Sequence, residues 1–124
     1  MQLPKLVAML FMTSSFTRVQ AVADSVTCIL KQPDIYLAIL DFCYTTNDDL
    51  VVPSAYAAAG AYHGNKWVGI PGNCDPPQWV PDHFCVSQMF EVCARAPASG
   101  VNHMTWGNDN CQTFTTFYAG WARD

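Results

Sequence analysis

The chain has 124 residues, of which 51% are hydrophobic, 13% aromatic and 13% charged, and its formal net charge is −4. This high aromatic content, with a charged fraction roughly half the usual 25%, excludes an intrinsically disordered chain. No apolar run reaches the ~18 residues of a membrane span, and the length fits one domain.

Residues 1–23 have the organisation of a secretory signal peptide. Lys5 supplies a positive n-region, a mainly apolar stretch follows it, and Ala21 and Ala23 give the small-x-small pattern read by signal peptidase. We expect cleavage after Ala23, with Ala21 as the alternative, and a single mature domain at residues 24–124. An N-terminal core helix is the competing interpretation, which the cleavage pattern disfavours.

The predicted mature domain is acidic. Cleavage removes Lys5 and Arg18, which leaves four basic residues against ten acidic ones and a net charge of about −6. Binding to a phosphate backbone or to anionic lipid depends on clustered Lys and Arg side chains. Four scattered cations cannot form such a cluster, so we expect neither nucleic-acid binding by charge nor membrane binding.

The first element of the mature domain is predicted to be a buried helix at residues 33–43. Pro33 and Asp34 precede a dense apolar run, and this pair is typical of the first turn of a helix. A central strand would show a similar run and stays open as the alternative. Polar residues 45–49 then predict a turn, and residues 52–60 predict a short alanine-rich helix with a glycine stop.

A turn at residues 63–66 and a strand at residues 66–70 are predicted next. Residues 71–81 contain four prolines of the eight in the chain, which predicts an ordered loop without regular structure. Because Cys74 and Trp79 lie in this loop, we expect it to be pinned at one point and packed at another.

Residues 82–96 predict an amphipathic helix that Asp82 caps and Pro97 ends. Its apolar face comprises Cys85, Val86, Met89, Phe90 and Cys93, and its polar face Ser87, Gln88, Glu91 and Arg95. Residues 107–110 predict a turn and residues 111–121 a strand rich in threonine and aromatic residues. Together these elements predict an α+β fold, with two or three short helices packed on a small antiparallel sheet.

All six cysteines follow the predicted cleavage site, a pattern typical of three disulfides formed in an oxidising compartment. They are Cys28, Cys43, Cys74, Cys85, Cys93 and Cys111. Zinc is disfavoured because no C-x-x-C pair occurs. The pairing stays open, with one exclusion. On one helix, Cys85 and Cys93 would lie about 12 Å apart, whereas the Cα atoms of a disulfide lie within about 7 Å.

The sequence offers few groups for catalysis. Glu91 and Arg95 are one helical turn apart, a spacing typical of a surface ion pair. His63 and His103 fall in predicted loops and would suit acid–base catalysis, because histidine titrates near neutral pH. No sequence feature brings these two histidines together. We therefore expect no catalytic residue, no metal site and no cofactor.

The tryptophans are the stronger candidates for function. All four of them lie in predicted loops or strands: Trp67, Trp79, Trp106 and Trp121. A small domain can bury all four, but tryptophans exposed on loops are frequent anchors of protein interfaces. Trp79 and Trp106 also adjoin turn residues. We therefore predict Trp79, Trp106 and Trp67 as binding residues.

A cleavable leader, a short acidic mature part and six cysteines resemble the small secreted cysteine-rich proteins of filamentous fungi. Many of these are effectors that plant pathogens deliver to the host. The resemblance covers the whole chain and is one of architecture. It implies a secreted, non-enzymatic virulence effector that binds a host protein, in the host apoplast or inside host cells, or that shields the fungus from host defence.

A second resemblance is to guanyl-specific fungal ribonucleases and the effectors built on their fold. The segments at residues 43–46 and 57–63 resemble the Cys-Tyr turn and Ala-Ala-Gly helix of that family. The family places its catalytic Glu on a strand, whereas Glu91 and Arg95 fall on a predicted helix, which implies a lost catalytic set. Two alternatives to the effector stay open. One is a small secreted ribonuclease-like protein, and the other is a toxin or antimicrobial protein acting on competing microbes, which the acidic charge disfavours.

Overall fold

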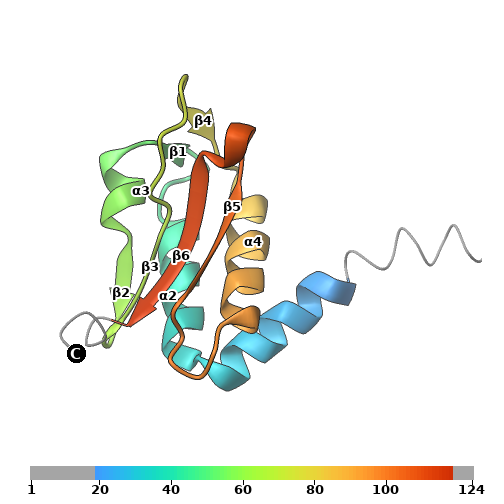
Figure 1. The fold of residues 1–124 in the computed structure, drawn as a ribbon. Coiled ribbons are helices and arrows are strands. Elements are labelled where there is room, and N and C mark those ends of the chain that lie inside the picture. Colours follow the sequence, from blue (N-terminus) through green and yellow to red (C-terminus); the bar gives the residue numbers. More distant parts are fainter. Residues whose placement is uncertain (1–18, 119–124) are drawn as a thin grey trace, which may run out of the picture.

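The main sheet of the protein is antiparallel, with strand order β2-β3-β6-β5. Its strands are β2 (Ala61–His63), β3 (Lys66–Gly69), β5 (Asn102–Trp106) and β6 (Gln112–Tyr118). Helices α2 (Pro33–Tyr44) and α4 (Asp82–Arg95) lie side by side behind this sheet in Figure 1. The structure is a computed structural model that describes residues 19–118. Most of the predicted leader, and Trp121, lie outside the described residues. The α+β prediction is confirmed.

Helix α2 confirms the prediction for residues 33–43. Pro33 occupies the first turn with Asp34, and the residues that α2 buries recur at helical spacing: Ile35, Ala38, Ile39, Phe42 and Cys43. Helix α4 also forms as predicted, but Asp82 is not its cap. Pro81 holds the N-cap position, and Asp82 is the first helical residue.

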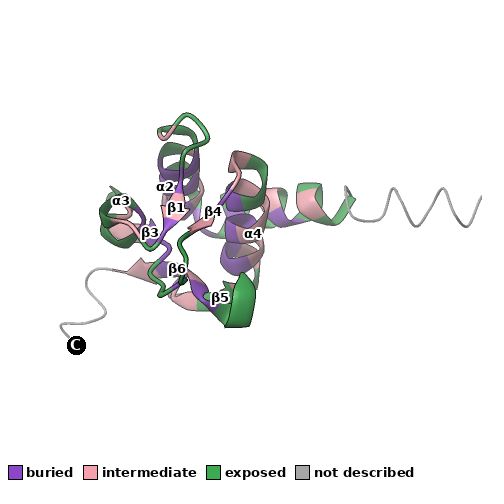
Figure 2. Ribbon diagram, turned by 90° about the horizontal axis from the view of Figure 1, so that it is seen from above, coloured by how far each residue is buried: buried purple, intermediate pink, exposed green. Residues whose placement is uncertain are grey.

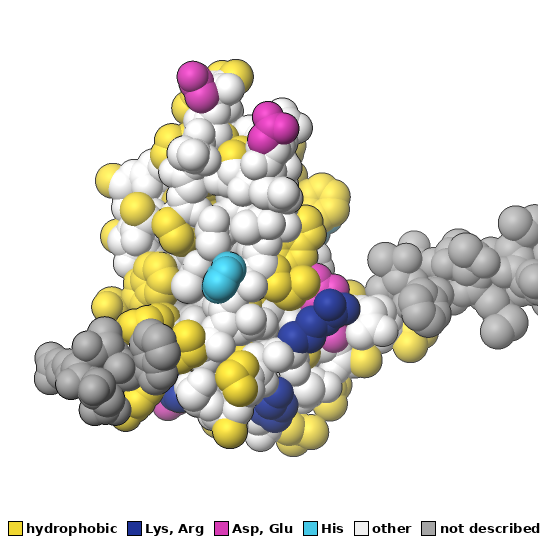
Figure 3. All heavy atoms as spheres, in the orientation of Figure 1, with side chains coloured by type: hydrophobic (Ala, Val, Ile, Leu, Met, Phe, Trp, Pro, Cys, Tyr) yellow, Lys and Arg dark blue, Asp and Glu magenta, His cyan; other side chains and the backbone are white. Residues whose placement is uncertain are grey.

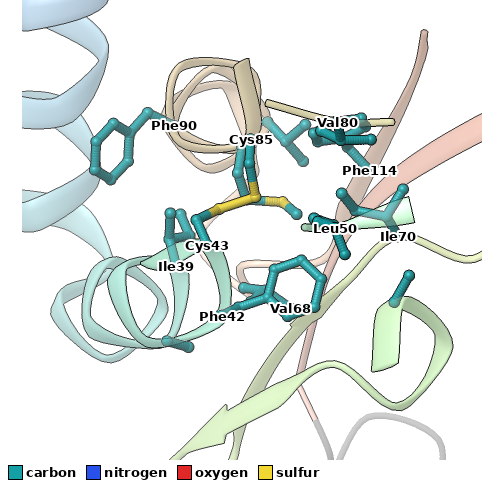
Figure 4. Packing of buried hydrophobic residues seen from close by; sticks show 14 of the residues in the cluster. Ile39, Phe42, Cys43, Leu50, Val68, Ile70, Val80, Cys85, Phe90 and Phe114 are labelled. Atoms are coloured by element: carbon teal, nitrogen blue, oxygen red, sulfur yellow. A yellow bond between two sulfur atoms is a disulfide. The ribbon is translucent and has the colours of Figure 1, made fainter. Parts of the chain in front are cut away.

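The core lies between the two helices and the inner face of the sheet. Figure 2 colours the buried residues purple along α2, α4 and the strands, and Figure 4 shows the packing of their side chains. Phe42 of α2 and Phe114 of β6 are both fully buried. Tyr36 stacks on Phe90 of α4, with ring centroids 5.3 Å apart. Burial of such side chains contributes about 1.5–3 kcal/mol each, which holds the two helices on the sheet.

Three disulfides connect elements that are distant in sequence, so the predicted involvement of all six cysteines is confirmed. The pairs are Cys28–Cys93, Cys43–Cys85 and Cys74–Cys111. The first ties the N-terminal helix at residues 19–31 to α4, and the second joins α2 to α4. The excluded pair does not form. Its two cysteines, both on α4, each reach another element.

Several parts of the chain differ from the prediction, including the helix at residues 19–31 and strand β2, neither of which was predicted. Residues 71–81 are not wholly irregular, because β4 (Gln78–Trp79) pairs with β1 (Val51–Val52) in a second antiparallel sheet. Strand β5 was not predicted at all. Strand β1 pairs with a segment distant in sequence, which local patterns do not reveal. Strand β5 pairs with the next strand, β6, but its polar residues Asn102 and His103 gave no strand pattern. The alanine-rich helix does form as α3 (Ala55–Ala59), with Ser54 as its N-cap and Gly60 as its C-cap.

Side chains of the sheet alternate between the core and an outer face. On β6, Phe114 and Thr116 are buried, whereas Thr113 and Thr115 are half-buried. His103 of β5 pairs with Thr115 and therefore lies on the outer face. No helix among the described residues is long and apolar enough to cross a membrane. The helix at residues 19–31 runs through the predicted cleavage site, and cleavage there remains a prediction.

Candidate binding site

Trp79 and Trp106, which are 27 residues apart in sequence, line one cavity of about 200 Å³. We call this cavity the aromatic cleft. The side chains that form most of its wall are Trp79, Phe84, Gln88, Trp106 and Gln112. The structure therefore brings together two of the three predicted binding residues, from β4 and from the end of β5.

Trp79 forms the most exposed wall of the cleft. Its strand pairs with β1, which sets Trp79 opposite Val51. The indole Nε1 donates a hydrogen bond of 2.7 Å to the backbone carbonyl of Asp48, while 57% of the residue surface stays exposed. The expectation that this residue packs the loop is therefore wrong. The polar edge of the indole is fixed, and its apolar face is open to solvent.

Trp106 is held more firmly. Its ring meets Phe114 edge-on, with centroids 4.9 Å apart and an interplanar angle of 73°. Gly107 follows with φ +82° and ψ 179°, a conformation nearly restricted to glycine. A Cβ atom on Gly107 would lie 2.6 Å from Gln78 Oε1 and 2.9 Å from Gln112 Cγ. The glycine thus allows the chain to turn tightly at the base of the cleft.

Helix α4 supplies the opposite wall. Phe84 and Gln88 are one turn apart and line the cleft together, and 47% of Phe84 is exposed. A second cavity of about 170 Å³ shares Gln88 and Trp106 and continues to Glu91 and Asp24. Phe84 was not among the predicted site residues. The signal in the sequence was a large aromatic residue that falls outside the apolar face of its helix.

A third cavity, of about 280 Å³, adjoins the aromatic cleft and is polar. Its wall includes Asn73, Asp75, Gln78 and Asp109. Gln78 stands between the two cavities, because its Oε1 accepts hydrogen bonds of 3.2 Å from Gln112 Nε2 and from the backbone N–H of Asn108. The disulfide Cys74–Cys111 ties the two loops that carry these polar residues.

Carboxylates crowd the start of α4 beside the cleft. The backbone N–H of Asp82 donates to Asp48 Oδ1 at 2.7 Å, and Asp82 Oδ1 is buried without a hydrogen-bond partner. Loss of hydration and the nearby charges of Asp48 and Asp49 raise the pKa of Asp82 above its ordinary value of 3.8. This end of the molecule therefore holds more negative charge than its own groups offset.

Trp67, the third predicted binding residue, does not line the cleft. It lies on β3, and its Nε1 donates to the carbonyl of Ala59 at 2.8 Å. Its ring occupies the space that a Cβ atom would need at Gly60 or Gly69. Trp67 therefore packs α3 against the sheet.

The two candidate histidines do not meet. They lie on strands rather than in the predicted loops, and β2 and β5 are the opposite edges of the main sheet. His63 Nδ1 instead lies 3.1 Å from Asp34 Oδ1, with both side chains half-exposed. The surface ion pair of Glu91 and Arg95 forms as expected, at 3.2 Å on α4.

All six cysteines are in disulfides, so none is free to bind zinc. Among residues 19–118, no three His, Cys, Asp or Glu side chains are grouped so as to hold a metal ion. No protein-family model, curated protein or solved structure matches the chain. Its function is therefore argued from the chemistry of its surface.

Proposed function

We propose that the protein is secreted and acts by binding a partner protein in the aromatic cleft, as a fungal virulence effector that acts on a plant host. The observation that carries the binding proposal is the joining of Trp79, Phe84 and Trp106 in one cavity. The effector setting rests on the leader, the size and the cysteine pattern of the chain.

The cleft has the properties of an interface anchor point. It combines an exposed indole with a second, half-buried indole, and tryptophan is among the residues that dominate binding energy. Its volume of about 200 Å³ is below the ~300–1,000 Å³ of typical small-molecule sites. A single side chain of a partner protein suits this volume better than a whole small molecule does.

The cleft also lacks the groups that catalysis would need. Its polar side chains are the amides Gln88 and Gln112, and no residue that lines it titrates near neutral pH. Three disulfides are consistent with an extracellular protein, in agreement with the proposed secretion. Both observations favour a rigid extracellular binding protein.

The test is affinity capture from plant extracellular fluid and cell extract, followed by mass spectrometry. The bait is the oxidised protein obtained by secretion of the full chain, compared with its Trp79→Ala variant. Tyr62→Ala is the matched control, because Tyr62 is 62% exposed on β2, far from the cleft in the strand order. We expect a host protein that the wild type and Tyr62→Ala retain and Trp79→Ala loses. Equal capture by all three baits would contradict the proposal.

A second candidate is a histidine-dependent hydrolase, in keeping with the ribonuclease resemblance. One observation favours it: the contact of 3.1 Å between His63 and Asp34. A carboxylate can orient a histidine for acid–base catalysis. The test is cleavage of single-stranded RNA by the wild type and by His63→Ala. RNA cleavage by the wild type that is lost in His63→Ala would assign the protein as an enzyme. If neither the wild type nor His63→Ala cleaves RNA, this candidate function is excluded.

A further inference from the structure

Negative charge gathers at the cleft end of the molecule. Asp82 begins α4, two residues before Phe84. The backbone carbonyl of Asp48 accepts a hydrogen bond from Trp79 Nε1, and its carboxylate accepts one from the backbone N–H of Asp82. Asp75 and Asp109 line the adjoining polar cavity. Carboxylates therefore stand on two sides of the aromatic cleft.

The basic side chains lie at the other end of α4. Arg95 ends this helix, Lys31 Nζ donates to the carbonyls of Ala94 and Ala96, and Lys66 Nζ donates to the carbonyl of Ser99. A helix of 14 residues at ~1.5 Å per residue spans about 20 Å. In Figure 3, acidic side chains stand at the end near β4 without Lys or Arg beside them, whereas Lys and Arg lie toward the opposite end, where acidic side chains also occur.

This separation leaves the carboxylates without a nearby cation among the described residues. Charges about 20 Å apart interact weakly at physiological salt, where the screening length is about 8 Å. Loss of hydration raises the pKa of Asp82 most, and the charge of Asp48, whose carboxylate accepts a hydrogen bond from the backbone N–H of Asp82, raises it further. An incoming positive charge would relieve the repulsion between these carboxylates, whereas an incoming anion would increase it.

Aromatic faces beside carboxylates suit one side chain in particular. The guanidinium group of arginine is planar, stacks on indole rings and pairs with a carboxylate through two parallel hydrogen bonds. Trp79 supplies an exposed indole face, and the carbonyl that holds its Nε1 belongs to Asp48. The ring and the carboxylate are thus fixed close to each other by the fold.

We propose that the aromatic cleft binds an arginine side chain from a basic segment of the partner protein. This inference rests on the proposed function and specifies the chemistry of the partner. The guanidinium stacks on Trp79, and the carboxylates of Asp48 and Asp82 attract it. The neighbouring basic residues of the segment lie toward Asp75 and Asp109 in the polar cavity.

The test uses fluorescence anisotropy with a labelled peptide of four Arg-Gly repeats and the oxidised protein from the full chain. Two further peptides carry lysine or citrulline, the uncharged analogue of arginine, in place of each arginine. We expect binding to the arginine peptide, about threefold weaker binding to lysine and at least tenfold weaker binding to citrulline. Equal binding of the arginine and citrulline peptides would overturn the inference.

Matched variants locate the bound peptide. We expect Trp79→Ala to weaken binding about tenfold and Asp48→Asn about threefold to tenfold. Asp34→Asn makes the same charge change at the far end of α2, a 12-residue helix that spans about 18 Å, and we expect less than a twofold effect. Equal weakening by Asp34→Asn and Asp48→Asn would show unspecific attraction and overturn the proposal.

Failure of this inference is distinguishable from failure of the proposed function. If the cleft captures a host protein that depends on Trp79 but the arginine peptide neither binds nor competes, the proposed function stands and the inference is wrong. A neutral oligosaccharide, the hexamer of N-acetylglucosamine, serves as a further probe. Trp79-dependent binding of this sugar without binding of the arginine peptide would contradict both proposals and assign the cleft to carbohydrate.

Discussion

The indole Nε1 of Trp79 donates a hydrogen bond of 2.7 Å to the backbone carbonyl of Asp48, 31 residues earlier in the chain. This contact satisfies the polar atom of the ring while 57% of the residue stays exposed. It also joins the loop that carries the carboxylates to the strand that carries the aromatic surface. The cleft therefore forms only in the folded chain.

Replacing Trp79 should separate binding from folding. Trp79→Ala removes one hydrogen bond and a side chain that is more than half exposed, so we expect the free energy of unfolding to fall by about 1–2 kcal/mol. We expect partner capture to weaken at least about tenfold. Thermal unfolding monitored by circular dichroism measures the first effect, and titration with the captured partner the second. A loss of several kcal/mol without loss of binding would show that Trp79 serves the fold.

Trp106 is a less suitable position for the same experiment. Its ring packs edge-on against Phe114, which is fully buried. We expect Trp106→Ala to lower the free energy of unfolding by about 3 kcal/mol, in the range for removal of a large core side chain. An unchanged melting temperature for Trp106→Ala would contradict the packing described above.

The acidic pair predicts a variant that gains stability and loses binding. Loss of hydration and, after it, the charge of Asp48 raise the pKa of Asp82. A carboxyl with a raised folded-state pKa makes the fold less stable as pH rises from 3.8 through that pKa. Asp48→Asn keeps the Oδ1 acceptor and removes the repulsion, so we expect higher stability than wild type above this window and little difference below it. Denaturant unfolding at a series of pH values measures this. A stability difference independent of pH would contradict it.

Two glycines provide a matched test of the turn that follows Trp106. Gly107 and Gly100 have nearly the same φ, +82° and +83°, and each lies close to neighbouring side chains. Alanine at either position should lower stability by about 1–3 kcal/mol. Only Gly107 contacts Gln78 and Gln112 at the cleft, so we expect Gly107→Ala alone to weaken binding of the arginine peptide. Equal weakening by Gly100→Ala would mean that binding follows general stability.

The disulfides should be essential to the fold. They link residues 65, 42 and 37 apart, and loops of this length contribute about 4 kcal/mol each in the chain-entropy model. Together they are comparable with the ~5–15 kcal/mol stability of a typical domain. We expect full reduction to unfold the protein at 37 °C, which loss of the near-UV circular dichroism signal would report. A retained signal would show that the core alone is sufficient.

Local pattern predicted helices α2, α3 and α4 well, but not the helix at residues 19–31. Pro33 with Asp34 marked the start of α2, and the apolar spacing from Cys85 to Cys93 marked α4 and excluded a bond between those two cysteines. The strands that were missed are short, and each is held by pairing with another strand, either adjacent or distant in sequence. Strand β1 pairs with β4, and β5 pairs with β6. Their register comes from the folded sheet and has little trace in the local sequence.

The candidate site was predicted only in part, for the same physical reason. Their position beside predicted turns indicated Trp79 and Trp106 as binding residues. That both line one cavity depends on the pairing of β4 with β1 and on the position of α4. Trp67 was chosen on the same grounds, and the structure places it against α3. Sequence spacing does not distinguish a tryptophan that packs from one that lines a cleft.

The most direct test of the binding site is a titration of ¹⁵N-labelled protein with the arginine peptide, followed through the indole N–H signals by two-dimensional NMR. Each signal is assigned by a single Trp→Phe substitution. We predict that the signals of Trp79 and Trp106 shift with peptide concentration while that of Trp67 stays in place. A shift of Trp67 alone, or no shift of any indole signal, would contradict the account.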